Sequence, residues 1–148
     1  SARGVTAHPR PLSQPHPPIW IGGNSAQARQ RVADRGDGWA PFPAPATLAR
    51  TARTVALGTM DELAASVHDL RSRLVAAGRD PDGIDVSFAC PAGGDPATDA
   101  FDADAHLAGL SDLAAIGVTW VQVGLPGDDL TQTLETLERY GERVIARA

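Results

Sequence analysis

The chain has 148 residues, of which 43% are hydrophobic and 21% charged, values typical of a globular domain with room for a core. Its net charge of −5 gives no reason to expect nucleic acid or an anionic membrane surface as a partner, and no apolar run approaches the roughly 18 residues of a membrane helix. The single cysteine, Cys90, excludes an internal disulfide and favours a reducing compartment such as the cytoplasm.

Residues 1–18 contain five prolines and two histidines and are predicted to form a connecting segment without a core of its own. The chain starts with serine and shows no signal peptide, so we expect it to begin within a larger protein. All 13 basic residues are arginine, which excludes Schiff-base chemistry and a P-loop lysine within this chain.

The first strand is predicted at residues 19–21, and a helix over residues 25–35 follows it. Ser25 is the expected N-cap, and Gly36 is the expected stop. A second short strand over residues 39–42 ends in a proline-rich loop, and a less regular helical stretch follows at 47–57.

A capping box at Thr59 and Glu62 opens the next helix, which ends at Gly78. Its apolar face is formed by Leu63, Val67, Leu70 and Leu74.

The third strand is predicted at 84–90, and an acidic loop over 91–104 leads into a helix that Gly117 closes. The fourth strand is predicted at 118–125. The last helix follows two aspartates, which suit its positive N-terminal end, and carries Leu130, Leu134, Leu137 and Val144.

Strands and helices therefore alternate four times over residues 19–148, which predicts an α/β fold with parallel strands and crossover helices. The pattern alone does not separate an open four-stranded sheet from half of an eight-stranded barrel, because both use the same right-handed unit.

The segment "HPPIWIGGNS…RGDGWAPFPAP" resembles the luciferase-like monooxygenase superfamily, in its branch of probable oxidoreductases that use the deazaflavin coenzyme F420. The later segments "TMDELAASVHDLRSRLVAAGRDP…IDVSFA" and "LAAIGVTWVQVGLP" are similar to downstream parts of the same branch. The resemblance implies that residues 19–148 are the C-terminal half of a (β/α)8 TIM barrel, with four β/α units in one domain.

The resemblance also implies an enzyme that transfers a hydride between the cofactor and a small organic substrate, with this chain supplying part of the cofactor site. Coenzyme F420 is the first choice, and FMN-dependent monooxygenation is the second. Catalytic acids and bases would come from an N-terminal half, so the chain alone would be inactive. The alternatives are a non-catalytic half-barrel and a phosphate-binding barrel isomerase or lyase. Because four strands leave two exposed edges, we expect a homo-oligomer or a complementary N-terminal half-barrel.

The turn after the first strand is the predicted cofactor site. Gly22 and Gly23 have no Cβ, so a flat ring or a phosphate can approach the backbone, and the following helix N-terminus favours an anion. Asn24 and Ser25 can add side-chain hydrogen bonds.

Trp39 and Phe42 are predicted to line a substrate pocket, with a packed core aromatic as the alternative for Trp39. Arg29 is interpreted as an exposed helix residue or a phosphate ligand.

No metal site is predicted. The four histidines lack metal spacing and are assigned to surface or capping roles, and the aspartates at 95, 99, 102 and 104 do not match a calcium loop. Cys90 lacks a local signature for a nucleophile and is interpreted as a small buried residue. The turn at 124–127 is a weaker phosphate candidate, because two aspartates follow it.

Overall fold

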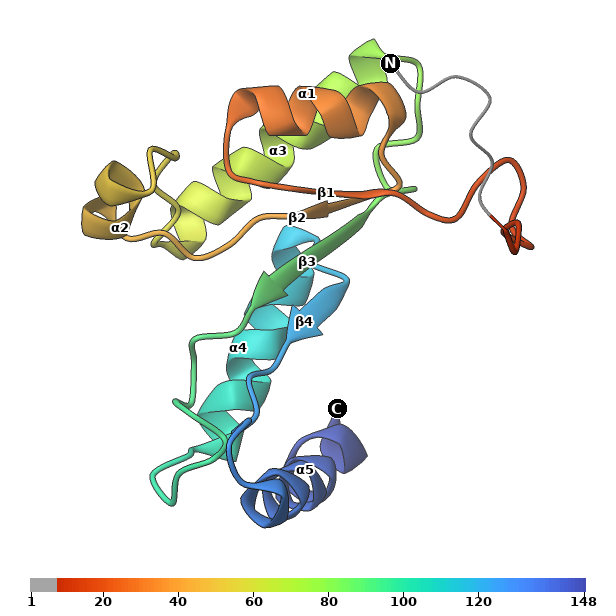
Figure 1. The fold of residues 1–148 in the computed structure, drawn as a ribbon. Coiled ribbons are helices and arrows are strands. Elements are labelled where there is room, and N and C mark those ends of the chain that lie inside the picture. Colours follow the sequence, from red (N-terminus) through yellow and green to blue (C-terminus); the bar gives the residue numbers. More distant parts are fainter. Residues whose placement is uncertain (1–7) are drawn as a thin grey trace.

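The computed structural model describes residues 8–148, which form a sheet of four parallel strands with helices between them (Figure 1). The strands are β1 (Trp20–Gly22), β2 (Gly38–Ala40), β3 (Asp85–Ala89) and β4 (Trp120–Gln122), and their order in the sheet follows the sequence. This arrangement confirms the predicted α/β fold with crossover helices. The predicted strands lie in the right places: β1 keeps its predicted length but is shifted by one residue, whereas the other three strands are shorter than predicted, and β4 keeps only the middle of the span 118–125.

Residues 1–18, which were predicted to form a connecting segment, lie partly outside the described residues. Residues 8–18 contain no helix or strand.

The helices are α1 (Ala26–Arg35), α2 (Ala46–Thr51), α3 (Met60–Ala76), α4 (Ala103–Ile116) and α5 (Leu130–Arg143), followed by a 3-10 turn at Ile145–Arg147. Two of their starts were predicted from local chemistry. Ser25 caps α1 by accepting a hydrogen bond from Ala28 N, and Thr59 and Glu62 form the full capping box of α3. None of the helices within residues 8–148 has both the length and the apolarity to cross a membrane.

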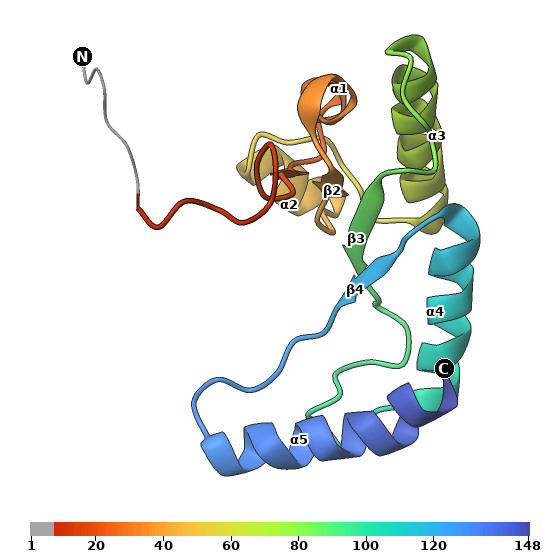
Figure 2. The same cartoon turned by 90° about the vertical axis from the view of Figure 1, so that its right-hand side faces the viewer.

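The main core lies between one face of the sheet and the helix layer of α1, α3 and α4 (Figure 2). The predicted apolar face of α3 contributes to this core, as do alternate residues of the strands. Its largest fully buried side chains include Trp39, Leu57, Leu63, Leu70, Leu74 and Leu113.

Within residues 8–148, no helix covers the opposite face of the sheet. Trp20 and Trp120 stand on it with ring centroids 5.9 Å apart, and their exposed fractions are 39% and 57%. The Trp20 ring lies so close to Gly38 that a Cβ there would be only 2.7 Å from it. A large apolar surface is therefore open to solvent on this face.

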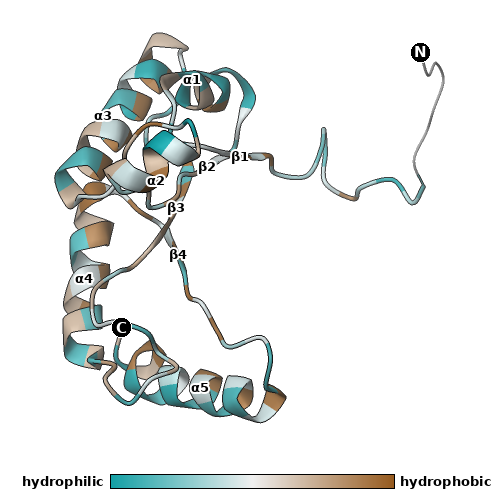
Figure 3. Cartoon of the chain, turned by 60° about the vertical axis from the view of Figure 1, so that its left-hand side comes forward, coloured by the Kyte–Doolittle hydropathy of each residue, from teal (hydrophilic) through white to brown (hydrophobic). Residues whose placement is uncertain are grey.

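Helix α5 lies across the end of α4 rather than on the sheet (Figure 2). It packs there through Tyr140 and Val144 against Phe101 and Ala103. Three of the four apolar residues that mark it in the sequence, Leu130, Leu134 and Leu137, are about half or more exposed. Their stripe therefore has no partner among residues 8–148. In Figure 3, apolar segments are interspersed with hydrophilic ones along α5.

Candidate functional site

The carboxyl ends of the four strands meet along one edge of the sheet, which we call the carboxyl edge. In parallel α/β folds the loops after the strands form the ligand site. Two places on this edge differ in character. One is the turn from β1 into α1, residues 22–25, which we call the glycine corner. The other lies between the loops that follow β3 and β4.

The glycine corner leaves backbone accessible at the end of β1. Gly22 is exposed, and a Cβ built on it would contact only Ala40 O at an ordinary 3.6 Å. Gly23 has φ +105°, a conformation that side chains other than glycine rarely adopt, so the backbone itself requires glycine here. The two glycines thus serve different purposes: space at Gly22 and conformation at Gly23.

Asn24 holds the glycine corner to two other loops. Its side chain is 1% exposed. Oδ1 accepts a hydrogen bond from Phe42 N (3.0 Å), while Nδ2 donates to Phe42 O (3.0 Å) and Val55 O (3.2 Å). The predicted hydrogen bond from this amide to a cofactor therefore requires correction: both ends of the amide bind protein backbone, and Asn24 positions the corner.

Ser25 is likewise engaged by the protein. Its Oγ accepts from Ala28 N at 3.1 Å, which satisfies one of the free N–H groups of the first turn of α1. The N–H groups of Ala26 and Gln27, both exposed residues, remain at the helix end without an intrahelical partner. The anion-binding capacity of the corner therefore resides in backbone N–H groups.

The two predicted pocket residues, Trp39 within β2 and Phe42 just after it, differ in burial. Trp39 is 0% exposed within the core, and its Nε1 donates to Gly23 O at 2.9 Å. The alternative of a packed core aromatic describes it, and it does not form a pocket wall. Phe42 is 40% exposed at the exit of β2 and remains available to a ligand at the carboxyl edge.

Arg29 is neither exposed nor free. Its Nε donates to Asp69 Oδ2 at 2.6 Å, and another guanidinium nitrogen donates to Asn24 O at 2.9 Å. The guanidinium carbon also lies 5.8 Å from the centre of the Trp39 ring. Arg29 thus supports the glycine corner from the helix layer.

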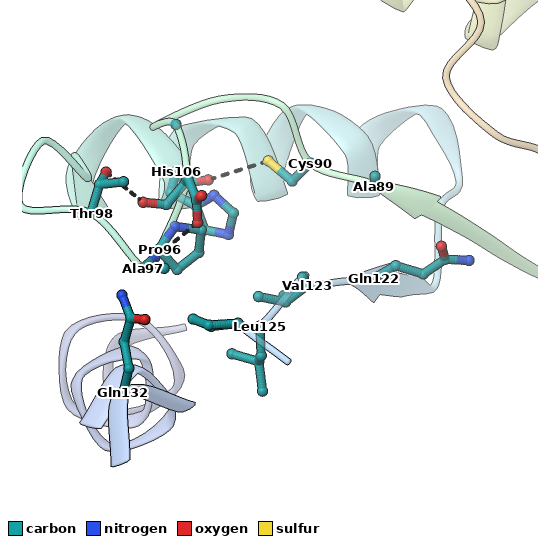
Figure 4. A pocket seen from close by; sticks show the side chains of 14 residues that line it. Ala89, Cys90, Pro96, Ala97, Thr98, His106, Gln122, Val123, Leu125 and Gln132 are labelled. Atoms are coloured by element: carbon teal, nitrogen blue, oxygen red, sulfur yellow. Dashed lines mark hydrogen bonds between the residues drawn. The ribbon is translucent and has the colours of Figure 1, made fainter. Parts of the chain in front are cut away.

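An open cavity of about 570 Å³ lies between the loops after β3 and β4 (Figure 4), and we call it the β3–β4 cavity. One wall comes from the end of β3 and the loop after it, another from the end of β4, and a third from α5. The lining residues are Ala89, Cys90, Gly94, Asp95, Pro96, Ala97, Thr98, His106, Gln122, Val123, Gly124, Leu125, Pro126 and Gln132.

The sequence interpretation was also wrong for His106, which is 2% exposed rather than on the surface. Its Nδ1 lies 2.8 Å from Ala92 O and its Nε2 lies 3.0 Å from the Tyr140 hydroxyl. A carbonyl oxygen only accepts, so Nδ1 carries the proton, and in the neutral ring Nε2 accepts from Tyr140. The signal in the sequence was its position between Ala103 and Leu107 on the apolar side of α4.

Cys90 and Tyr140 are uncharged at neutral pH. Burial, aided by the negative charge of Asp112, raises the pKa of the Cys90 thiol, and burial raises the pKa of Tyr140. A protonated thiol is a poor nucleophile, which agrees with the lack of a nucleophile signature in the sequence, but Cys90 is partly rather than fully buried.

The acidic loop before α4 serves the helix. Asp102 caps α4 by accepting from Asp104 N and Ala105 N. Within residues 8–148, no group of three or more histidine, cysteine, aspartate or glutamate side chains is placed to share a metal ion.

Comparison with known proteins gives a family match. The family model described as luciferase-like monooxygenase matches residues 1–111, three quarters of the chain. No curated protein matches the chain.

Among solved structures, the chain resembles the coenzyme F420 dependent tetrahydromethanopterin reductase of Methanopyrus kandleri, with a TM-score of 0.61 and 14% identity, over 88% of this chain and 50% of the reductase. The chain thus spans about half the length of that reductase, and the shared fold confirms the predicted half of a (β/α)8 TIM barrel. It also aligns with a riboflavin lyase solved with modified FMN and riboflavin, with a TM-score of 0.38 and 21% identity, over 64% of this chain and 18% of the lyase.

Proposed function

The chain belongs to the luciferase-like monooxygenase family, and on that premise we propose that it supplies part of the cofactor site of a flavin- or deazaflavin-dependent oxidoreductase. Coenzyme F420 is our first choice, since the sequence segments resemble the F420 branch and the reductase of similar fold is named as F420 dependent. FMN, with monooxygenation as the reaction, is the second.

The observation that carries this proposal is the bare backbone of the glycine corner, which leads directly into a helix N-terminus. Gly22 leaves room for a flat ring to lie against the main chain. The N–H groups of Ala26 and Gln27 and the dipole of α1 favour an anionic group beside it. A ring with an anionic tail is the common chemistry of both cofactors, so the corner fits either.

The bound cofactor would supply the hydride chemistry, and the protein would supply position and electrostatics. In this chain Gly22 and the first turn of α1 would bind, while Asn24, Trp39 and Arg29 hold the corner in shape. None of these residues is placed to donate or remove a proton from a ligand. The acid and base of the reaction would therefore come from a complementary half.

The test is titration of the purified chain with F420 and with FMN while cofactor fluorescence is followed. Gly22→Val is the informative variant, because Gly22 has ordinary backbone angles and a branched side chain would fill the open space. Valine at Gly23 would also strain the backbone, so it would not separate space from folding.

We expect Gly22→Val to weaken binding at least about tenfold, or roughly 1.4 kcal/mol. Gly127→Val, at a position with open space on a different loop, is the matched control and leaves binding unchanged. Undiminished binding by a folded Gly22→Val protein would remove the glycine corner from the site. A response to neither cofactor would instead favour the non-catalytic half-barrel.

We also propose that a complementary four-unit half-barrel, or failing that a second copy of the chain, covers the open face of the sheet. Support comes from the exposed Trp20 and Trp120, the free edges of β1 and β4, and the doubled length of the reductase of similar fold. This assembly would be contradicted if the chain sediments as a stable, monodisperse monomer and does not bind the complementary half.

A further inference from the structure

We propose that the β3–β4 cavity binds an uncharged organic molecule that carries amide-like hydrogen-bonding groups. Calling this molecule the substrate rests on the proposed function, because the cavity shares the carboxyl edge with the glycine corner. The preference for an uncharged ligand rests only on the cavity.

The position and size of the cavity suit a small organic ligand. It opens at the carboxyl ends of β3 and β4, whereas the glycine corner stands at the end of β1, the strand at the far side of the same sheet. Its volume of about 570 Å³ falls within the roughly 300–1,000 Å³ of typical small-molecule sites. A ligand there would not compete with one at the glycine corner.

The charges around the cavity disfavour an anion. No arginine is among the lining residues, and Asp95 is the one carboxylate among them. The arginines nearby on α5 point to other partners: Arg139 pairs with Asp99 and donates to Pro96 O, and Arg143 donates to Phe101 O. A carboxylate or phosphate entering the cavity would meet no opposite charge, and burial of an unpaired ion is costly.

The polar groups of the cavity are instead neutral donors and acceptors. Gln132 on α5 presents a carboxamide at the cavity, whereas the amide of Gln122 at the end of β4 donates to Ser87 Oγ at 3.0 Å and points away from Gln132 (Figure 4). The Thr98 hydroxyl donates to Asp95 O at 2.9 Å and therefore offers the ligand only an acceptor, while Ala89, Val123 and Leu125 supply apolar surface. Carboxamides pair best with groups that offer a donor and an acceptor side by side, such as amides, lactams and heterocycle edges.

His106 fixes two of the walls relative to each other. Through Nδ1 it holds Ala92 in the loop after β3, and through Nε2 it holds Tyr140 on α5. Because both ring nitrogens are occupied, His106 is a positioning residue and presents ring surface to the ligand. The cavity is therefore preformed, which reduces the ordering cost of binding.

Benzamide and benzoate form a suitable probe pair, since they have the same shape and differ in charge. We expect benzamide to shift the backbone amide NMR signals of residues 89–98 and 122–126 and to bind at least about tenfold more tightly than benzoate. Equal affinity for the two probes, or shifts that lie elsewhere, would overturn the proposal.

Gly124→Leu, with Gly127→Leu as its control, tests where the ligand binds, and Gln132→Arg tests the preference for an uncharged ligand. Gly124→Leu places a side chain in the cavity, where a Cβ has no neighbour within 4 Å, and should abolish benzamide binding. Gly127→Leu adds the same side chain to the same loop but outside the lining, and should leave binding unchanged. Gln132→Arg changes an exposed helix residue and should raise benzoate affinity to that of benzamide or above.

Unchanged benzamide binding in Gly124→Leu, or no gain for benzoate in Gln132→Arg, would refute the assignment. These outcomes are separate from the cofactor titration. If benzamide binds as expected and neither F420 nor FMN binds, the cavity stands and the proposed function fails. If the cofactors bind and benzamide does not, the proposed function stands and the cavity proposal fails.

Discussion

At the β1 end of the carboxyl edge, side chains turn inward and hold the backbone, whereas at the β3–β4 end they line an open cavity. Asn24 and Trp39 are fully buried, and each donates to or accepts from main-chain atoms of the neighbouring loops. Gln122 and Gln132 are exposed at the cavity. A ligand at the first place would meet backbone, and a ligand at the second would meet side chains.

This difference suits the two ligands of a cofactor-dependent enzyme. Backbone N–H groups and a helix dipole recognise an anion and a flat ring without depending on side-chain identity. Side chains that line a cavity determine which molecule fits. We therefore expect substitutions at one end to leave ligand binding at the other end intact.

The largest effect is expected from Asn24→Ala. It removes three hydrogen bonds and leaves the N–H and C=O of Phe42 and the C=O of Val55 without this partner, so we expect a loss of about 2–4 kcal/mol in the free energy of unfolding. Urea unfolding measures this loss. Cofactor affinity should fall, while benzamide binding at the β3–β4 cavity should persist under native conditions.

Asn24→Asp keeps the acceptor for Phe42 N but sets a buried carboxylate against the carbonyl oxygens of Phe42 and Val55, so it should also destabilise the protein at neutral pH. Hydrogen exchange of the Phe42 amide should accelerate in both variants. A stable Asn24→Ala protein with slow exchange at Phe42 would mean that the amide does not hold the corner.

A smaller effect at the other end is expected from Tyr140→Phe. The ring stays packed against Phe101, and only the hydrogen bond to His106 Nε2 is lost, so the free energy of unfolding should fall by about 1–2 kcal/mol. Benzamide affinity should weaken because α5 is no longer tied to His106, and cofactor affinity should not change. If Tyr140→Phe weakens cofactor binding and leaves benzamide binding intact, the glycine corner and the β3–β4 cavity are not independent sites.

Tyr140 is the single tyrosine of the chain, so its ionisation can be followed by ultraviolet absorbance. Burial raises the pKa of Tyr140, and the folded protein should titrate above the ordinary value. A folded protein whose tyrosine titrates like a free one would place Tyr140 in solvent.

The helices were predicted well where their signals are local, whereas α2 covers only Ala46–Thr51 of the stretch predicted at 47–57. The Thr59 and Glu62 capping box and the Ser25 cap involve residues three apart, and the buried face of α3 follows a fixed period. The position of His106 on the apolar side of α4 was a local signal for its burial, but its hydrogen-bond partner Tyr140 lies 34 residues away and no local pattern predicts that contact.

The sequence pattern also did not predict on which face of the sheet a strand residue lies. Strands of parallel sheets are buried on both faces when a barrel is complete. The sequence around Trp39 is therefore the same whether its side chain packs against the helices or lines a ligand pocket. Asn24 was assigned to a ligand because its amide can add hydrogen bonds at the glycine turn, whereas its partners are Phe42 in the loop after β2 and Val55 in the segment between α2 and α3. The placement of both residues follows from tertiary contacts.

The smallest effect is expected behind the glycine corner, at Asp69 of α3. The hydrogen bond from Arg73, with a further one from Arg29, lowers the pKa of Asp69 against a smaller effect of burial. A lowered folded-state pKa gives stability that is present above the ordinary value of 3.8 and is lost as pH falls through the folded-state pKa.

Asp69→Asn should therefore reduce the free energy of unfolding at neutral pH, by less than about 1 kcal/mol because the carboxylate is partly exposed. The difference from the unmodified chain should shrink as pH falls below 3.8. Asp82→Asn, which removes a more exposed partner of Arg71, serves as the control and should have almost no effect. Since Arg29 also donates to Asn24 O, a loss of cofactor affinity in Asp69→Asn would show that the helix layer holds the corner in place. Equal stability losses for the two variants at every pH would show that the Arg29–Asp69 pair contributes no more than a surface contact.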